Sequence, residues 1–276
     1  KIETTSLSFT LRKLENEEYP EAFLRSHEEN ENTQEVLVSE LFDSIKNVGI
    51  ASTPEGGRPV LTGVYFNNRE EKTELAATDS YRLATQEISS FPIDDVGIIS
   101  FRSLSEVIRL FENEESTLKI NSNEKDLYFF NDKYFASLRK VEGSFPEYQN
   151  LFPKETLFTA EVNKNEILEC LDRSTVVAEG YIPVTFIFEN NDLLKITTLN
   201  KDVGGGNEEL KVKILGVETG DIDGFQMSFN PSFLIQGIEV LEGNKAYFRF
   251  SGNEKPVVIQ GDSENYKYLL MPVRSS

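Results

Sequence analysis

The sequence contains very little of the chemistry that catalytic and metal sites use: one cysteine, one histidine and no tryptophan in 276 residues. A single cysteine, Cys170, excludes an intrachain disulfide, and together with one histidine it argues against a zinc site. His27 lies in a charged stretch that we interpret as an interdomain linker, a poor place to hold a base against a nucleophile. Cys170 shares a predicted helical face with Ile167 and Leu171, which indicates a buried structural thiol.

Long apolar runs are also missing. No stretch approaches the ~18 residues that a membrane-spanning helix needs, and the first residues show no apolar core of a signal peptide. We therefore expect a cytoplasmic protein that does not contact membranes. A length of 276 residues with 38% hydrophobic and 11% aromatic content is typical of a globular protein of about two domains.

Positive charge is in deficit. The 28 Lys and Arg residues against 47 Asp and Glu residues give a net charge of −19. That negative net charge argues against a protein that binds nucleic acid over its whole surface. An acidic protein can still contact DNA through one surface that carries Lys and Arg. The acidic runs are typical of solvated faces, but the abundance of carboxylates leaves a carboxylate pair or a Mg²⁺ site open.

The chain repeats itself. Pro20, Pro146 and Pro272 are evenly spaced, and the helix-like run at 39–45 recurs at 165–171 with the same offset. Repeats of proline, helix and strand that stay in phase indicate duplicated domains.

We expect two complete domains, at residues 26–153 and 154–276, and we interpret residues 1–25 as the end of an earlier copy whose body is absent. Each complete domain contains two apolar patterns of helical spacing. Asn230 before Pro231 predicts a helix start. Apolar residues at helical spacing are Leu37, Leu41, Phe42, Ile45 and Val48, then Leu104, Val107, Ile108 and Phe111, then Ile167, Cys170 and Leu171, then Phe233, Leu234, Gly237, Ile238 and Leu241.

Alternating runs predict strands at 127–130, 184–188, 210–214 and 257–259. The fold class is therefore α+β, with antiparallel sheet packed on pairs of helices. Gly204-Gly205-Gly206 lacks the Lys-Ser/Thr and the following helix of a phosphate-binding loop, so a flexible hairpin loop is the better interpretation.

The segment 74–87 predicts a hairpin. Leu75, Ala77, Leu83 and Thr85 are assigned to one face, and the short oxygen side chains of residues 78–80 favour a tight turn. Tyr81 and Arg82 follow this turn. Composition alone favours an ordinary surface hairpin over a binding edge.

Two strings change that interpretation. Thr78-Asp79-Ser80-Tyr81-Arg82-Leu83-Ala84 resembles the signature of the bacterial sliding clamp, the beta subunit of DNA polymerase III. Tyr268-Leu269-Leu270-Met271-Pro272-Val273-Arg274 resembles the C-terminal tail of the same family. The resemblance implies a DNA-clamp fold with three similar domains per chain and two chains per ring. It also implies a non-enzymatic processivity factor without a cofactor, which tethers a polymerase to DNA.

In that family a groove between the second and third domains receives short linear motifs, with a glutamine and paired Leu/Phe anchors, from the polymerase III alpha subunit and the clamp-loader delta subunit. The apolar residues of the groove would remove the Leu/Phe anchors from water, at ~1.5–3 kcal/mol for each fully buried side chain. Without the resemblance, these aliphatic residues would be interpreted as ordinary core. The matching positions are Leu61, Thr78, Ser80, Tyr81, Arg82, Leu83, Pro146, Asn150, Leu151, Ile182, Asn230, Phe233, Leu269, Leu270, Met271, Pro272, Val273 and Arg274.

The match departs from the family pattern at two positions. Many members carry arginine at the position of Asn150, and a leucine at the position of Ser275 usually follows the final arginine. Both changes affect the predicted rim of the groove and leave its apolar floor.

In the family, helices lining the central hole present Lys and Arg to duplex DNA without reading sequence. The candidates here are Arg102, Lys46, Arg109, Lys164 and Arg173, and only Arg102 matches a basic family position well. The others fit solvent-facing helix charges equally.

The resemblance also implies a ring interface between the first domain of one chain and the third domain of the other. Tyr19 matches the first-domain side, and Val176 and Val177 match the third-domain side. A homodimer is expected for a full chain, whereas this chain, which we interpret as lacking most of the first domain, is not expected to close a stable ring. Alternatives are a clamp-like adaptor that does not encircle DNA and an acidic metal-dependent hydrolase.

Overall fold

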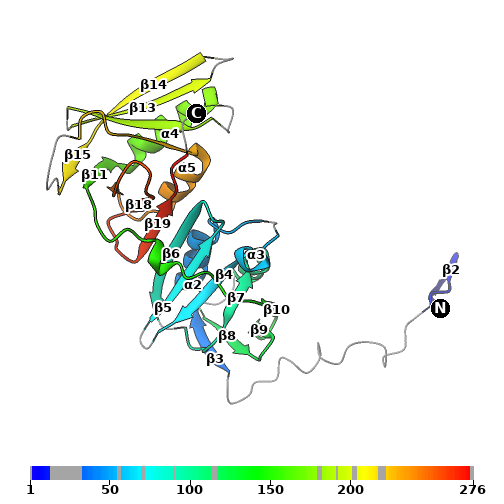
Figure 1. Cartoon of the computed structure of the whole chain (residues 1–276). Helices are drawn as coiled ribbons and strands as arrows, with labels where there is room; N and C mark the ends of the chain where they lie inside the picture. The colour runs from blue at the N-terminus through cyan, green and yellow to red at the C-terminus, as the bar shows by residue number, and fades with distance from the viewer. Residues whose placement is uncertain are drawn as a thin grey trace.

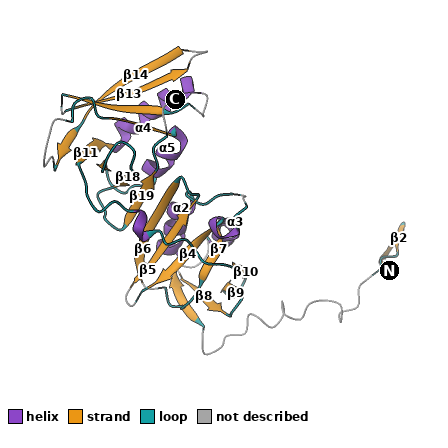
Figure 2. Ribbon diagram, in the orientation of Figure 1, coloured by secondary structure: helices purple, strands orange, loops and turns teal. Residues whose placement is uncertain are grey.

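The computed structural model describes residues 2–12, 33–54, 57–69, 72–89, 91–112, 117–178, 182–190, 192–200, 204–216 and 222–273. The N-terminal end of the described chain contains a small hairpin of β1 (Ile2–Thr4) and β2 (Leu7–Phe9), which forms a sheet of its own. Four α-helices are described in the remainder, α2 and α3 followed by α4 and α5 (Figure 2).

Two successive groups of elements make up the rest of the described chain. The first unit consists of β3 (Gln34–Leu37), α2 (Val38–Gly49), the 3₁₀ helix η2 (Pro59–Leu61), β4 (Gly63–Asn68), β5 (Lys72–Thr78), β6 (Arg82–Ser89), β7 (Gly97–Ser100), α3 (Phe101–Phe111), β8 (Thr117–Ser122), β9 (Asp126–Phe130) and β10 (Phe135–Val141). After the 3₁₀ helix η3 (Gln149–Leu151), the second unit consists of β11 (Phe158–Asn163), α4 (Lys164–Ala178), β12 (Val184–Glu189), β13 (Leu193–Asn200), β14 (Gly204–Lys211), β15 (Lys213–Leu215), β16 (Gln226–Phe229), α5 (Pro231–Glu239), β17 (Lys245–Phe250), β18 (Val257–Gln260) and β19 (Tyr266–Leu270).

The two units follow the same order of elements once η2 and β15 are set aside: a strand, a helix, four strands, a helix and three strands. Their strand pairings correspond as well. The sheet order β6-β5-β4-β7 in the first unit matches β14-β13-β12-β16 in the second, and β3-β8-β9-β10 matches β11-β17-β18-β19. The repeat read from the sequence is therefore a repeat of structure, and the fold is α+β. The predicted boundary after residue 153 lies in the connection between β10 and β11.

One sheet runs through both units. β19 of the second unit pairs antiparallel with β6 of the first, with Leu269 opposite Leu83 and Tyr266 opposite Gln86, and Figure 1 shows the two strands side by side. This pairing joins the strands of both units into a single sheet of thirteen strands.

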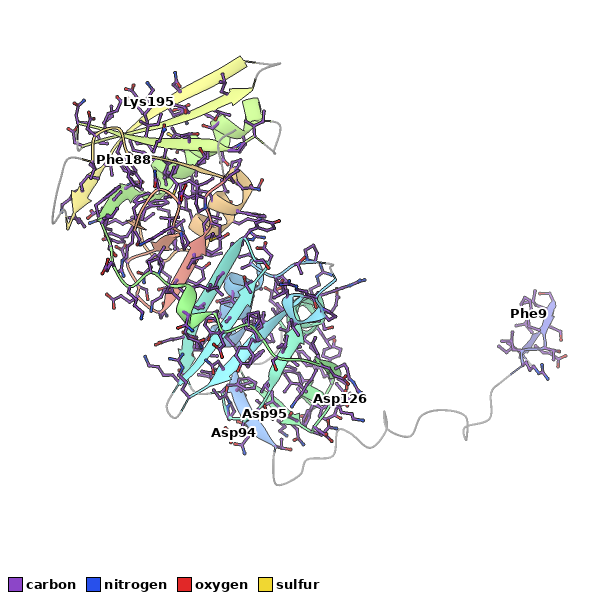
Figure 3. All side chains as sticks on the ribbon, viewed as in Figure 1. Phe9, Asp94, Asp95, Asp126, Phe188 and Lys195 are labelled. Carbon is purple, nitrogen blue, oxygen red and sulfur yellow. The ribbon has the colours of Figure 1, made fainter. Side chains whose placement is uncertain are left out.

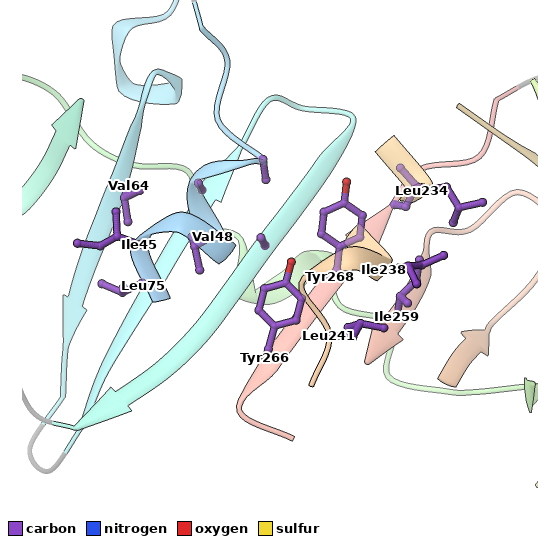
Figure 4. Close-up of a cluster of buried hydrophobic side chains, with 14 of the residues drawn as sticks. Ile45, Val48, Val64, Leu75, Leu234, Ile238, Leu241, Ile259, Tyr266 and Tyr268 are labelled. Atoms are coloured by element: carbon purple, nitrogen blue, oxygen red, sulfur yellow. The ribbon is translucent and has the colours of Figure 1, made fainter. Parts of the chain in front are cut away.

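Opposite faces of this sheet bury different clusters. The larger core lies on the face that carries the helices and continues across the junction: Tyr266 and Tyr268 of β19 lie between Val48 of α2 and Ile238 of α5 (Figure 4). Burying aromatic side chains at this seam ties the packing of the two units together, since each ring removes a large apolar area from water.

The other face is covered by the segment that connects the units. Tyr148 of this segment is 1% exposed and packs with Ala76, Leu83 and Leu269. Its hydroxyl donates to the Glu74 carboxylate and accepts from Asn67 Nδ2 at 3.1 Å. Because a buried hydroxyl needs partners, this arrangement fixes the connecting segment at the seam.

The predicted helix windows are confirmed, and so is the start of α5. Asn230 Oδ1 accepts hydrogen bonds from the backbone N–H of Ser232 at 3.0 Å and Phe233 at 3.3 Å, with Pro231 in the first turn. This is the capping arrangement that the sequence predicts.

The faces assigned to the hairpin at 74–87 are wrong. Asp79 N–H donates to Arg82 O at 3.3 Å and Thr78 lies opposite Leu83, so the loop contains only two residues, Ser80 and Tyr81. In a hairpin with a two-residue loop, an even-numbered residue pairs with an odd-numbered one. The type II′ form of this loop requires a positive φ at its first position, and Ser80 has φ 79°. Leu83 therefore lies on the connecting-segment face, opposite to the side that carries Leu75.

Two further predictions fail in the second unit. The expected strand at 210–214 is broken at Val212, whose N–H donates to Asp192 O at 2.9 Å, and it divides between β14 and β15. The expected glycine loop is the start of β14, where Gly206 pairs with Thr198 of β13. Hydrogen bonds to the neighbouring strand hold the glycines extended, which local propensity does not reveal.

Candidate functional site at the junction of the units

The turn between β5 and β6 is fixed by its own side chains. Thr78 Oγ1 donates to Arg82 O at 2.6 Å, and Asp79 Oδ1 accepts from the N–H groups of Tyr81 at 2.9 Å and Arg82 at 3.0 Å. Such local bonds are the reason why Thr and Asp favour turns. They leave the ring of Tyr81 projecting outward, 66% exposed.

Arg82 turns inward and joins the two units. It is 7% exposed. Its Nε donates to Asp79 Oδ2 at 2.9 Å, its Nη1 donates to Gln236 Oε1 of α5 at 2.5 Å, and its Cζ lies 4.0 Å from the ring centroid of Phe233. The planar guanidinium thus makes charge-assisted and ring contacts simultaneously, which a lysine does not reproduce.

Tyr268 completes this contact. Its hydroxyl donates to Phe233 O at 2.9 Å and lies 3.4 Å from Arg82 Nη1. Burial raises the pKa of Tyr268 to about 12, and the nearby positive charge of Arg82 opposes that rise. The hydroxyl therefore stays protonated as a donor throughout the neutral range.

Four of the predicted groove residues expose apolar side chains. We call them the junction patch: Tyr81, Leu151 at 49% exposed, Met271 at 39% and Val273 at 37%. Met271 N–H donates to Tyr81 O at 2.9 Å, and Val273 N–H donates to Ser228 O at 2.8 Å. Residues 271–273 therefore bridge the hairpin turn of the first unit and β16 of the second.

The remaining predicted groove residues differ in accessibility. Leu61, Thr78, Leu83, Leu269 and Leu270 are each at most 5% exposed. Partly buried positions are Ile182, Asn230, Phe233 and Pro272; exposed positions are Ser80, Pro146 and Asn150; Arg274 lies outside the described residues.

Most of the predicted DNA-facing cations are bound to the protein itself. Lys46 Nζ lies 2.5 Å from Glu112, Arg109 pairs with Glu106 at 3.0 Å, and Lys164 Nζ donates to the carbonyls at the end of α5. Arg102 on α3 is exposed, and no carboxylate of the described residues pairs with it. These exposed ion pairs add little stability, but they lower the charge that each cation presents.

Arg173, the fifth predicted cation, pairs with Glu208 of β14 at 2.9 Å, which raises the pKa of its guanidinium. Its Nη2 lies 3.2 Å from Cys170 Sγ. Burial nevertheless raises the pKa of the Cys170 thiol, so the thiol is protonated at neutral pH and is a poor nucleophile.

The predicted ring-interface residues are only partly described. Val176 on α4 is 81% exposed. Tyr19 and the side chain of Val177 lie outside the described residues.

The described residues contain neither a metal-binding cluster nor a membrane-spanning helix. They contain no group of three or more His, Cys, Asp and Glu side chains arranged to hold a metal ion. Asp94, Asp95 and Asp126, which Figure 3 labels, lie toward one end of the first unit and form no such group. None of the described helices is long and apolar enough to cross a membrane.

Sequence reasoning missed the residues that hold the junction together. Gln236, Tyr268 and Tyr148 were not singled out for that role, although Tyr148 gives a signal: it is an aromatic residue in the polar string Glu147-Tyr148-Gln149-Asn150 between the two units. Gln236 gives none, because its partner lies far away in the sequence.

Comparison with known proteins decides the family. The model of the DNA polymerase III beta subunit central domain matches residues 35–147, and that of the C-terminal domain matches residues 149–274. The beta sliding clamp of Streptomyces coelicolor is 30% identical over 287 residues, covering 98% of this chain and 73% of that protein. The chain belongs to the beta sliding clamp family.

Other members of the family are more distant. The beta sliding clamp of Staphylococcus aureus is 25% identical, covering 97% of this chain and 70% of that protein. Solved clamp structures share the fold: the DNA polymerase sliding clamp of Bacillus subtilis aligns with a TM-score of 0.84 at 24% identity over 99% of this chain and 72% of that one. The clamp from Pseudomonas aeruginosa aligns with a TM-score of 0.83 at 20% identity over 97% and 71%.

Proposed function

We propose that the chain acts as a non-catalytic processivity factor of DNA replication, which tethers a DNA polymerase to duplex DNA and docks partner peptides on the junction patch. The family supports the first part, and the geometry of the patch supports the second. Exposed Tyr81, Leu151, Met271 and Val273 offer an apolar surface held in shape by the buried Arg82 contact beneath it.

The chemistry of the patch suits short apolar anchors. An apolar side chain that covers it is removed from water at about 25 cal/mol per Å². Met271 adapts its shape to different partners, as methionine does at promiscuous surfaces. The expected partners are the polymerase III alpha subunit, the clamp-loader delta subunit and other proteins with the same motif.

A fluorescence-polarisation titration tests the docking proposal. The probe is a labelled peptide with the sequence Gln-Leu-x-Leu-Phe, and saturable micromolar binding is expected. Met271→Glu should abolish binding, because it places a charge in the apolar surface. Leu110→Glu is the matched control, since Leu110 on α3 is 37% exposed and is not a member of the patch.

Equal binding by the two variants would contradict docking on the junction patch, as would binding of a peptide whose Leu-Phe is replaced by Ala-Ala. Either result would leave the family and the fold unaffected. DNA-binding and divalent-metal titrations would then be the next measurements.

We also propose that the edge of β14, which pairs with β13 alone among the described strands, is where another protomer pairs without closing a ring. The repeat of the two units supports this proposal. β14 in the second unit takes the place that β6 takes in the first, and the edge of β6 pairs with β19, a strand of the other unit. An uncovered strand edge presents unpaired backbone groups that favour pairing with another chain. Val176 and Leu199, 81% and 73% exposed, lie on α4 and β13 next to it.

Sedimentation velocity tests this second proposal. If the edge of β14 mediates association, Val176→Glu should shift the sedimentation coefficient toward the monomer at a given concentration. Leu110→Glu should not. An identical concentration dependence for both variants would refute the assignment of this edge.

We propose that contact with DNA is weak and non-specific, with Arg102 as its principal described cation. Arg102→Gln should lower affinity equally for unrelated duplexes and reduce the dependence on salt. Filter binding at several salt concentrations measures both effects, and an effect confined to one DNA sequence would overturn the assignment.

A further inference from the structure

The chain contains two methionines and one cysteine, and the fold leaves only one of these sulfur-containing residues exposed. Met227 of β16 and Cys170 of α4 are each 3% exposed, whereas Met271, which follows β19, is 39% exposed. Access of the oxidant to sulfur is one condition for its oxidation. An oxidant dissolved in water therefore meets Met271 before it meets the other two.

Cys170 is protected by its protonation as well as by burial. A thiol reacts with oxidants as the thiolate. Burial raises the pKa of the Cys170 thiol, and the Glu208 carboxylate, whose Oε2 lies 3.6 Å from Sγ, adds to that rise while Arg173 opposes it. A thioether carries no proton to lose, so neutral pH leaves Met271 reactive and Cys170 inert.

The backbone places Met271 in the junction patch. Leu270, the last residue of β19, is 1% exposed, and successive side chains of an extended segment point to opposite sides, so the side chain of Met271 points outward. Its N–H donates to Tyr81 O at 2.9 Å. Met271 is therefore anchored beside Tyr81, and a chemical change of its side chain is a change of the patch itself.

We propose that Met271 is a modification site at which a peroxide reversibly weakens peptide docking on the junction patch. This inference rests on the docking function proposed above. The thioether sulfur attacks one oxygen of hydrogen peroxide, the O–O bond breaks, an S=O bond forms and water leaves. Sulfur loses the two electrons that peroxide gains. A dithiol returns two electrons and two protons through a sulfoxide reductase, and the oxygen leaves as water.

The sulfoxide changes what the patch can bind. A thioether packs adaptably against apolar side chains, whereas the sulfoxide is polar and its oxygen only accepts hydrogen bonds. A Leu or Phe anchor offers no side-chain donor, and the carbonyl of Tyr81 that accepts from Met271 N–H is itself an acceptor. Covering the patch would leave the sulfoxide oxygen desolvated and unpaired, which should weaken peptide binding about tenfold or more.

Peptide mapping by mass spectrometry locates the modification after brief exposure of the intact chain to hydrogen peroxide, which catalase then removes. We expect Met271 to gain one oxygen atom about tenfold or more faster than Met227, because buried Met227 reacts only when the fold opens. Cys170 should stay unmodified over the same period. A saturating amount of a Gln-Leu-x-Leu-Phe peptide without sulfur should slow the oxidation of Met271, since docking covers it.

Fluorescence polarisation then compares each chain with itself before and after peroxide. The wild-type chain should lose about tenfold or more in affinity, and the two methionine sulfoxide reductases with a dithiol should restore it. Met271→Leu should show the same affinity before and after treatment, because leucine contains no sulfur. Met227→Leu is the matched control, since it removes the buried sulfur, keeps Met271 and should respond to peroxide as the wild-type chain does.

The outcomes separate this inference from the docking proposal. If the untreated chain does not bind the peptide, the docking proposal fails and the inference fails with it. If the untreated chain binds and oxidation of Met271 leaves the affinity unchanged, only the inference fails. A loss of affinity in peroxide-treated Met271→Leu, or oxidation of Met227 or Cys170 as fast as Met271, would also overturn it. Circular dichroism verifies that the treated chains are folded.

Discussion

Replacing Arg82 by methionine measures how strongly the buried contact at the junction stabilises the protein. The change keeps most of the side-chain volume but removes the guanidinium. Asp79, whose side chain is 11% exposed, then loses its ion-pair partner, and Gln236 and Phe233 lose theirs. Breaking one side of a buried pair costs about 3–5 kcal/mol.

The lower end of that range applies here. Asp79 keeps two backbone N–H donors, from Tyr81 and Arg82, which continue to stabilise its charge. We therefore expect Arg82→Met to lower the free energy of unfolding by roughly 3 kcal/mol. For a chain of this size that corresponds to a fall of about 6–12 °C in Tm.

Urea denaturation followed by far-UV circular dichroism measures the change. Arg109→Met is the matched control, since Arg109 forms an ion pair with Glu106 at 3.0 Å on the exposed face of α3, and we expect it to cost less than about 1 kcal/mol. The double variant Arg82→Met/Asp79→Asn should recover part of the loss, because no buried charge remains unpaired. A cost for Arg82→Met no greater than that for Arg109→Met would refute the assignment.

Three other changes test separate parts of the fold. Between about pH 10 and 12 the free energy of unfolding should fall by about 3 kcal/mol through Tyr268 alone, because the unfolded tyrosine ionises first while burial raises the folded pKa of Tyr268 to about 12. Tyr268→Phe should reduce that fall, as measured by urea midpoints across this range. Asn230→Ala removes the cap of α5 and should cost about 1 kcal/mol in the same assay, whereas Asn230→Ser should cost less. Gly237→Ala places a Cβ 2.4 Å from the Tyr268 ring and should lower stability by about 1–3 kcal/mol, whereas Gly206→Ala meets no atom within 4 Å and should not.

Local and periodic features of the fold were accessible from the sequence. Apolar residues at helical spacing predicted all four described helices, and Asn230-Pro231 predicted the start of α5, because these signals depend only on neighbouring residues. The duplicated order of elements was visible for the same reason: each unit must bury the same faces, so the pattern recurs.

Features that depend on distant residues were not accessible. The two faces of the hairpin were mixed because a two-residue loop was not recognised, and the parity of strand pairing follows from loop length. The glycines of β14 read as a loop because their hydrogen-bond partners lie on β13. Likewise, nothing near Arg82 in the sequence indicates its contacts with Gln236 and Phe233.

The residues of the junction patch were chosen through resemblance and not through local physics. Leu83 and Leu270 look the same in the sequence as Leu151 and Val273, yet the first two are nearly inaccessible and the last two are exposed. Burial at this point depends on how β19 meets β6, a contact between segments far apart in the chain.

The pairing of β6 with β19 also has a consequence for synthesis on the ribosome. β6 ends at Ser89 and its partner begins at Tyr266, so at 5–20 residues per second the edge of β6 waits roughly ten to thirty-five seconds for its partner to be made. During that interval the first unit can fold its helices and remaining strands, but the row of backbone donors and acceptors along β6 stays open to other nascent chains. β19, the last of the described strands, is thus the one that closes the first unit.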